Sequence, residues 1–149
     1  MSLNAIHFVS LLFAVLALVP AGAHLLELPN KIGLAPAEYL TVQKIYRGWA
    51  LAGVFVVGAL LSTLVLTIKV RHEPRIFILA LIAFLCILGS QVIFWSVTYP
   101  VNQQTNDWTL LLGNWVELRN KWEYSHAASA VLNLTAVTAL ILSALARSR

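Results

Sequence analysis

The sequence predicts an all-α fold, an integral membrane four-helix bundle. Hydrophobic residues make up 60% and charged residues 11% of the 149 residues, and the mean hydropathy is +0.82. An average soluble domain is roughly 45–50% apolar and about 25% charged. Four apolar runs each approach the roughly 20 residues that a helix needs to cross about 30 Å of hydrocarbon. We expect spans at Ile6–Leu28, Tyr46–Ile68, Ile76–Thr98 and Ala127–Ala146.

These spans leave no room for a soluble domain, so residues 1–149 are expected to form a single transmembrane domain. The lone Cys86 excludes an intramolecular disulfide and a cysteine-based metal site, and a small apolar packing role is expected for it. The stretch "VPAGAH" ends the first run with a small-x-small triplet that signal peptidase could read. No basic residue precedes that run in "MSLN", so we expect it to remain a spanning helix.

Basic residues that flank the spans indicate the orientation. Five lie on each side: Lys69, Arg71, Arg75, Arg147 and Arg149 with the termini, and Lys31, Lys44, Arg47, Arg119 and Lys121 opposite. The tight turn "KVRHEPR" holds three of the first group, whereas Arg47 and Arg119 are expected inside the fold. We therefore expect a protein of the bacterial inner membrane with both termini on the cytoplasmic side. The net charge of +4 then reflects membrane anchoring and not nucleic-acid binding, because no basic patch with interleaved aromatics occurs.

The two loops on the side opposite the termini contain helix-start signals. Pro36 suits a first helical turn, and "AEYLTVQKIYRGW" follows without a breaker, so the second helix is expected to run unbroken from Pro36 into the membrane. Asn114 followed by Glu117 fits an N-cap with a capping-box partner. The fourth helix is therefore expected to start near Trp115 and to be formed already where it meets lipid.

Ionisable residues gather where the first helix ends and the fourth enters the membrane. Arg119, Glu123 and His126 are spaced i, i+4, i+7 and share one helix face, and His24 and Glu27 are spaced i, i+3. Since the two helices run in opposite directions, both groups lie at about the same depth. Such groups cost about 2.5–3.5 kcal/mol at the bilayer centre and tend to face inward and pair. We predict one joint polar site, with the two histidines within roughly 10 Å of each other.

The other two helices add polar and aromatic residues at the same end. Gln91, Trp95 and Thr98 are spaced i, i+4, i+7 on the third helix, and Tyr46, Arg47 and Trp49 begin the second. Tryptophan also serves as a membrane-interface anchor, which is the alternative role of Trp49, Trp108 and Trp115. The predicted substrate-binding residues are Gln91, Trp95, Asn102, Trp115 and Trp122.

Two chemistries suit these residues. A Glu-x-x-His pair on one helix is the arrangement of metal centres in four-helix bundles, so His24, Glu27, Glu123 and His126 are candidate ligands for zinc, iron or copper. Two glutamates are fewer than the four of a di-iron site. Without metal, His126 would act as a base oriented by Glu123, Arg119 would steady an anionic intermediate, and His24 would complete the catalytic group. The cofactor stays open between none and such an ion.

The blocks "NWVELRNKWEYSHAASAVL", "YPVNQQTND" and "PAGAHLLELPNKI" resemble a family of small four-helix membrane proteins that includes the anthrone oxygenase-like proteins. The resemblance covers the whole chain. The family pattern pairs a Pro-x-Asn in the last loop with a Trp, an Arg and a His entering the fourth helix, matched here by Pro100, Asn102, Trp115, Arg119 and His126. It implies oxygenation of an activated aromatic methylene by molecular oxygen without a conventional cofactor. This chain differs from that pattern at Ser129, where many members of the family are expected to have a basic residue.

The function expected from these observations is that of an oxidoreductase, a monooxygenase acting on a small hydrophobic aromatic molecule at one membrane face. The alternative is a non-enzymatic membrane protein that binds or passes a small ligand or a metal ion. Expected partners are the lipid bilayer and the small molecule, with an oligomer left open. Beyond Asn133 the fourth helix offers only Thr135, Thr138 and Ser143, so a pocket closed toward the cytoplasm is expected.

Overall fold

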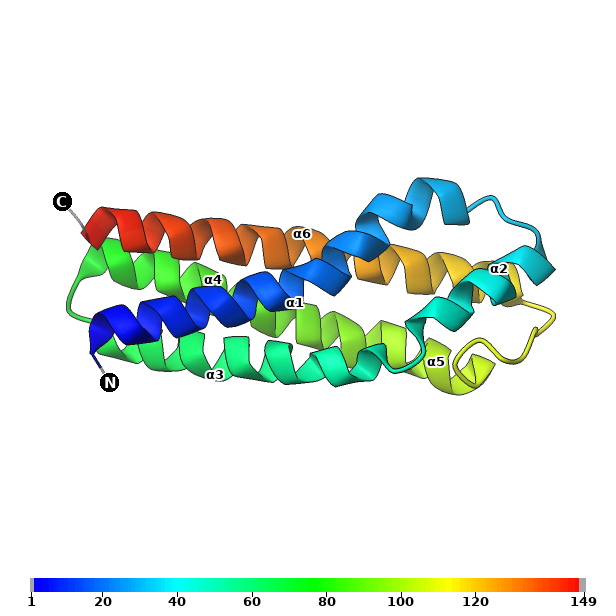
Figure 1. Ribbon diagram of the computed structural model, residues 1–149, viewed down its shortest axis with the longest axis horizontal. Helices are drawn as coiled ribbons and strands as arrows, with labels where there is room; N and C mark the ends of the chain where they lie inside the picture. Colours follow the sequence, from blue (N-terminus) through cyan, green and yellow to red (C-terminus); the bar gives the residue numbers. More distant parts are fainter. Residues whose placement is uncertain (1, 148–149) are drawn as a thin grey trace.

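Four long helices form the body of the molecule. The computed structural model describes residues 2–147, and no strand occurs among them; Arg149, counted above for orientation, lies outside this range. Helices α1 (Leu3–Lys31), α3 (Gly53–Lys69), α4 (Pro74–Ile93) and α6 (Trp115–Arg147) run along the long axis, with both ends of the chain at one end of the bundle (Figure 1). α1 and α4 each pack against α3 and α6. The predicted all-α bundle is confirmed, with four helical stretches long and apolar enough to cross a membrane.

Small side chains fill the middle of the bundle. Ala14, Ala59, Ala80, Ala83 and Ala136 are at most 1% exposed. Residues of this size let helix backbones approach closely, which is how helices associate in lipid. Large apolar side chains lie outside instead, among them Phe8, Val19, Leu61, Val92 and Leu145. This distribution is the one expected of a bundle surrounded by hydrocarbon.

Two short helices cover the end opposite the termini. These are α2 (Pro36–Gln43) and α5 (Tyr99–Thr105), seen at the right of Figure 1. α2 begins at Pro36 as predicted, and the Glu38 carboxylate accepts a hydrogen bond from the Ala35 N–H at 3.2 Å. Tyr39 projects from α2 and is the centre of a second hydrophobic cluster, together with Val101, Trp108, Leu118 and Trp122. This cluster holds the polar end of the bundle together.

The predicted unbroken second helix is wrong. After α2 the chain makes a 3₁₀ turn, η1 (Lys44–Tyr46), and then reverses at Gly48, whose φ is +84°. Only glycine adopts this left-handed conformation at little steric cost. A second 3₁₀ turn, η2 (Trp49–Ala52), leads into α3, so the membrane-spanning stretch begins at Trp49.

The third membrane-spanning stretch, Pro74–Thr105, changes its helical winding before the last loop. α4 continues into a π-helical turn, η3 (Phe94–Thr98), and then into α5. Pro100 lacks an N–H, and its ring would crowd the Ser96 carbonyl in an α-helix. A wider π turn avoids that contact, and such turns are frequent at functional sites.

The fourth long helix starts at Trp115, as predicted. The cap differs from the expected capping box. The Asn114 backbone carbonyl accepts from the Glu117 N–H at 3.0 Å, and the Glu117 carboxylate pairs with Lys121 at 2.7 Å on the surface.

Gly58 is the tightest point of the contact between α1 and α3. A Cβ built there would lie 2.5 Å from the Phe13 ring, whereas one at Gly22 would meet no atom within 4 Å. We expect Gly58→Ala to lower the free energy of unfolding by about 1–3 kcal/mol through overpacking. Gly22→Ala should leave it unchanged or raise it by up to about 1 kcal/mol. Thermal unfolding in detergent compares the two; equal effects would contradict the close α1–α3 contact.

Candidate functional site

Two histidines from different helices meet at the polar end. His24 on α1 and His126 on α6 are stacked, with ring centroids 4.0 Å apart and planes inclined by 25°. His24 is 5% exposed. The predicted proximity of these two side chains is confirmed. Residues that lie 102 positions apart in the chain meet because α1 and α6 are antiparallel neighbours.

Aromatic side chains enclose this histidine pair. The Trp122 ring lies edge-on to both, 4.2 Å from His126 and 5.0 Å from His24. Tyr46 and Trp49 approach His24 at 4.5 and 5.6 Å. The Trp122 indole N–H donates to the side-chain oxygen of Asn102 at 2.7 Å, which fixes the ring. The pair is therefore enclosed by aromatic side chains from α6 and from the segment between α2 and α3.

A buried lysine connects the two carboxylates beside the histidines. Lys31 is 3% exposed, and its ammonium lies 3.3 Å from both the Glu27 and the Glu123 carboxylates. It donates to the Tyr46 hydroxyl at 2.5 Å, and that hydroxyl donates to Glu27. The Tyr39 hydroxyl donates to Glu123 at 2.9 Å. These five residues form an ionic network that ties α1, α2 and α6 together.

Sequence reasoning missed Lys31 and Tyr39. Lys31 follows His24 by seven positions and Glu27 by four, so "HLLELPNK" places all three on one helix face. The predicted first span ends at Leu28, which leaves Lys31 outside it. α1 nevertheless continues through Pro29 to Lys31. No sequence pattern marked Tyr39 as a site residue, since its position depends on how α2 folds back over the bundle.

Arg119 does not face the histidine pair. Its guanidinium donates to the Leu34 carbonyl at 3.0 Å and lies 4.7 Å above the Trp115 ring. These contacts hold the connection between α1 and α2 against α6. Arg119 and Trp115 are therefore placed as partners of each other, and Lys31 is the cation near the predicted catalytic groups.

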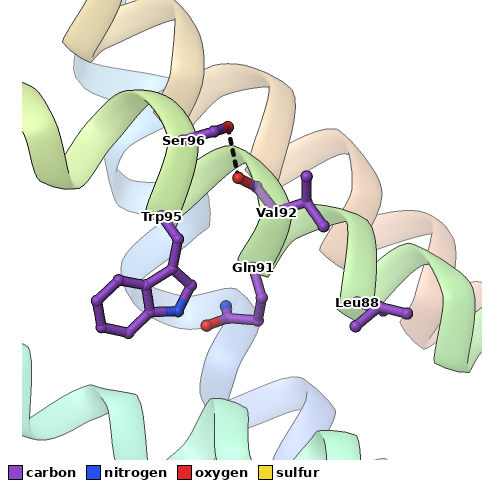
Figure 2. Close-up of a pocket in the computed structure, with 5 residues that line it drawn as sticks. All are labelled: Leu88, Gln91, Val92, Trp95 and Ser96. Atoms are coloured by element: carbon purple, nitrogen blue, oxygen red, sulfur yellow. Dashed lines mark hydrogen bonds between the residues drawn. The ribbon is translucent and has the colours of Figure 1, made fainter.

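Two predicted substrate-binding residues lie outside the cluster. Gln91 and Trp95 line an open pocket on α4 with Leu88, Val92 and Ser96 (Figure 2). Thr98 instead faces inward and bonds to the Ser125 hydroxyl at 2.8 Å. Trp95 and Thr98 both belong to the π-helical turn η3, whose winding differs from that of an α-helix, so the side chains do not share the face that α-helical spacing predicts. The predicted stripe is thus divided between two places.

The four predicted metal ligands do not fit a metal ion in this arrangement. Within residues 2–147, no three His, Cys, Asp or Glu side chains are grouped so that they could hold one. The Lys31 ammonium lies at the carboxylates that would have to bind the cation. The stacked imidazoles also do not direct their in-plane lone pairs to a point between the rings. This arrangement favours the metal-free alternative.

Several buried polar atoms at this site lack a hydrogen-bond partner among the described residues. They include Nδ1 of His24, Nε2 of His126 and the second carboxylate oxygen of Glu123. A neutral imidazole carries one donor and one acceptor nitrogen. Buried polar groups are nearly always satisfied, so unpaired ones next to each other indicate a place where a ligand or water binds. The arrangement can accept a proton or a hydrogen bond from a small polar group.

The opposite end of the bundle contains a separate polar contact. His7 Nε2 lies 3.0 Å from the Ser143 hydroxyl. Between this contact and the histidine pair, the core contains small apolar side chains, among them Ala14, Ala17 and Ala136. It also contains four buried neutral polar residues, Ser10, Thr63, Ser90 and Asn133. None of these side chains is ionisable, so the ionisable residues of the described core lie in two groups, one at each end of the bundle.

Comparison with known protein families, with curated proteins and with solved structures finds no match to this chain. The resemblance to anthrone oxygenase-like proteins therefore stays a prediction, and the geometry of the site carries the functional argument.

Lys31 is expected to be essential to folding. Lys31→Met would leave Glu123, which is fully buried, without its cation, and should lower the free energy of unfolding by about 3–5 kcal/mol. Adding Glu123→Gln should restore part of this loss, because no unpaired charge remains. The matched control is Lys121→Met in the exposed pair with Glu117, which should change stability little. Denaturation in detergent would refute the network's role if both lysine variants behaved alike.

The Tyr39 phenol should make stability fall at alkaline pH. Burial raises the pKa of Tyr39 well above its usual range, and the adjacent Glu123 charge raises this pKa further. The unfolded chain releases this proton near pH 10, whereas the folded chain retains it. Stability is therefore fully present below pH 10 and should fall above it by about 1.4 kcal/mol per pH unit from this group. Unfolding measured from pH 8 to 11 should show a shallower decline in Tyr39→Phe; an unchanged slope would contradict the assignment.

Proposed function

We propose that this protein is a membrane oxidoreductase that uses the His24–His126 pair to oxygenate a small hydrophobic aromatic molecule. The observation that supports this proposal is the stacked pair itself, with one unpartnered nitrogen on each ring inside an aromatic surround. Such a surround favours a planar apolar ligand, and the imidazole nitrogens can accept its proton.

The proposed reaction balances with molecular oxygen as the sole oxidant. A histidine nitrogen removes a proton from a ring methylene that is acidified by an adjacent aromatic ketone. The resulting carbanion adds oxygen at the same carbon, and the proton returns to give a hydroperoxide. Loss of water leaves a carbonyl group. One oxygen molecule is consumed and one water released for each methylene converted to a ketone, a four-electron oxidation of the carbon.

Neighbouring residues have supporting roles in this proposal. Trp122, fixed by Asn102, holds the His126 ring, and Tyr46 packs on His24. The Lys31 ammonium, paired with Glu27 and Glu123, holds these two carboxylates in place beside the site. We further propose a bacterial inner membrane with both termini in the cytoplasm, which places the histidine pair near the outer face.

A second candidate is a binding protein without turnover. It is favoured by Arg119, whose guanidinium is engaged with Leu34 and Trp115 and is not available near the histidines to stabilise an anion. A ligand could then be held at the pair by hydrogen bonds alone. The two proposals differ in whether oxygen is consumed.

Oxygen uptake in nanodiscs separates them. With 1,8-dihydroxyanthrone as substrate, we expect uptake above the rate of protein-free nanodiscs, reduced at least 100-fold in His126→Ala because the base is lost. His72→Ala, in the exposed turn between α3 and α4, should leave the rate unchanged. No substrate-dependent uptake by the wild type would overturn the enzyme proposal, and saturable binding without uptake would favour the second candidate.

Arg119→Lys tests the assignment of this arginine to structure. The variant keeps the charge but loses the planar fork that contacts Leu34 and Trp115. We expect lower thermal stability with nearly the same rate per folded molecule. A large fall in rate with stability intact would return Arg119 to the catalytic group.

A further inference from the structure

The pocket on α4 contains a polar group at an unusual place. Gln91 lies inside the membrane-spanning stretch Pro74–Thr105, yet its side chain opens to the pocket and not to the bundle core. Within the described residues its amide has no hydrogen-bond partner. The Ser96 hydroxyl, the other polar group of the pocket, is satisfied by the Val92 carbonyl at 2.6 Å (Figure 2). An amide without a hydrogen-bond partner is unfavourable in hydrocarbon, so a partner is expected there.

An aromatic platform adjoins this amide. Trp95 is 61% exposed and lies on the same side of α4 as Gln91 (Figure 2). Its ring is supported by Phe94 and Tyr99, at centroid distances of 5.2 and 5.1 Å. Trp95 and Ser96 belong to the π-helical turn η3, the kind of turn that is frequent at functional sites. Trp95 thus contacts two other aromatic rings and lies beside the unpaired amide.

The pocket is close in depth to the histidine pair. Thr98 follows Gln91 by seven positions, about 10 Å along a helix. Thr98 bonds to Ser125, the residue before His126. A molecule dissolved in the bilayer would thus meet Gln91 and Trp95 slightly closer to the bilayer centre than the histidine pair, which lies inside the bundle.

We infer that this pocket is a lipid-facing binding site for a planar aromatic molecule that carries a carbonyl or hydroxyl group. The amide both donates and accepts, so it can pair with either group, while the ring stacks on Trp95 and contacts Leu88 and Val92. Phospholipid acyl chains could fill the apolar part but offer nothing to the amide. The inference deepens the proposed function by giving its substrate class a first binding position in the membrane.

Photolabelling tests the site without requiring turnover. The probe is 4-hydroxybenzophenone, which has two aromatic rings, a carbonyl and a hydroxyl, and inserts into neighbouring C–H bonds on illumination. In nanodiscs we expect saturable labelling of the peptide that carries Leu88–Ser96, reduced at least fivefold in Gln91→Leu and retained in part in Gln91→Asn. The matched control is Thr138→Val, at an exposed position on α6, which should label like the wild type.

Each outcome bears on one proposal separately. Labelling spread evenly over the lipid-facing helices, or unchanged in Gln91→Leu, would overturn the binding site. Because Gln91→Leu makes a lipid-exposed position more apolar, its folding should be intact, and an unchanged melting temperature checks this. If the wild type consumes no oxygen but labels specifically, the pocket stands and the oxygenase proposal fails. If uptake occurs, Gln91→Leu should raise KM at least threefold with kcat unchanged.

Discussion

The ion pair between Lys31 and Glu123 is the interaction on which the polar end of the molecule depends. It joins α1 to α6 where both helices leave the region of small apolar side chains. Neither charge is accessible to solvent, so each is tolerated only because the other is present. Tyr39 donates from α2 to the carboxylate oxygen of Glu123 that also contacts Lys31, and thereby draws the extramembrane segment over the site. The histidine stack follows, since His24 lies two turns from Lys31 and His126 lies one turn from Glu123.

The bundle was predictable from the sequence because its determinants are local or periodic. Length and apolarity specify the spans, and the antiparallel order of consecutive helices follows from the short connections. The same periodicity brought His24, Glu27, Glu123 and His126 to one level. Positions that depend on chain reversal were not predictable. Gly48 adopts its left-handed conformation where the chain turns from α2, which packs on the bundle through Tyr39, into α3, and no local pattern distinguishes this glycine from one inside a helix.

The structure differs from the sequence-based prediction at two further places, and both differences have the same cause. Pro29 signals a helix end in most sequences, but here α1 continues past it to place Lys31 inside the site. Gln91 and Trp95 share a stripe with Thr98, yet only Thr98 faces α6. In both cases the position of a neighbouring helix decides which side chains are enclosed. A single-helix pattern specifies a face and cannot specify how much of that face is covered.

The middle of the described core is a layer without ionisable side chains, and this has a consequence for bioenergetics. The charged and titratable side chains of the site lie on one side of this layer, and the His7–Ser143 contact lies on the other. A proton released at the histidine pair would therefore leave toward the same aqueous phase from which it could be replaced. No charge would cross the low-dielectric layer during a reaction cycle, so chemistry at this site would be electroneutral and independent of the membrane potential.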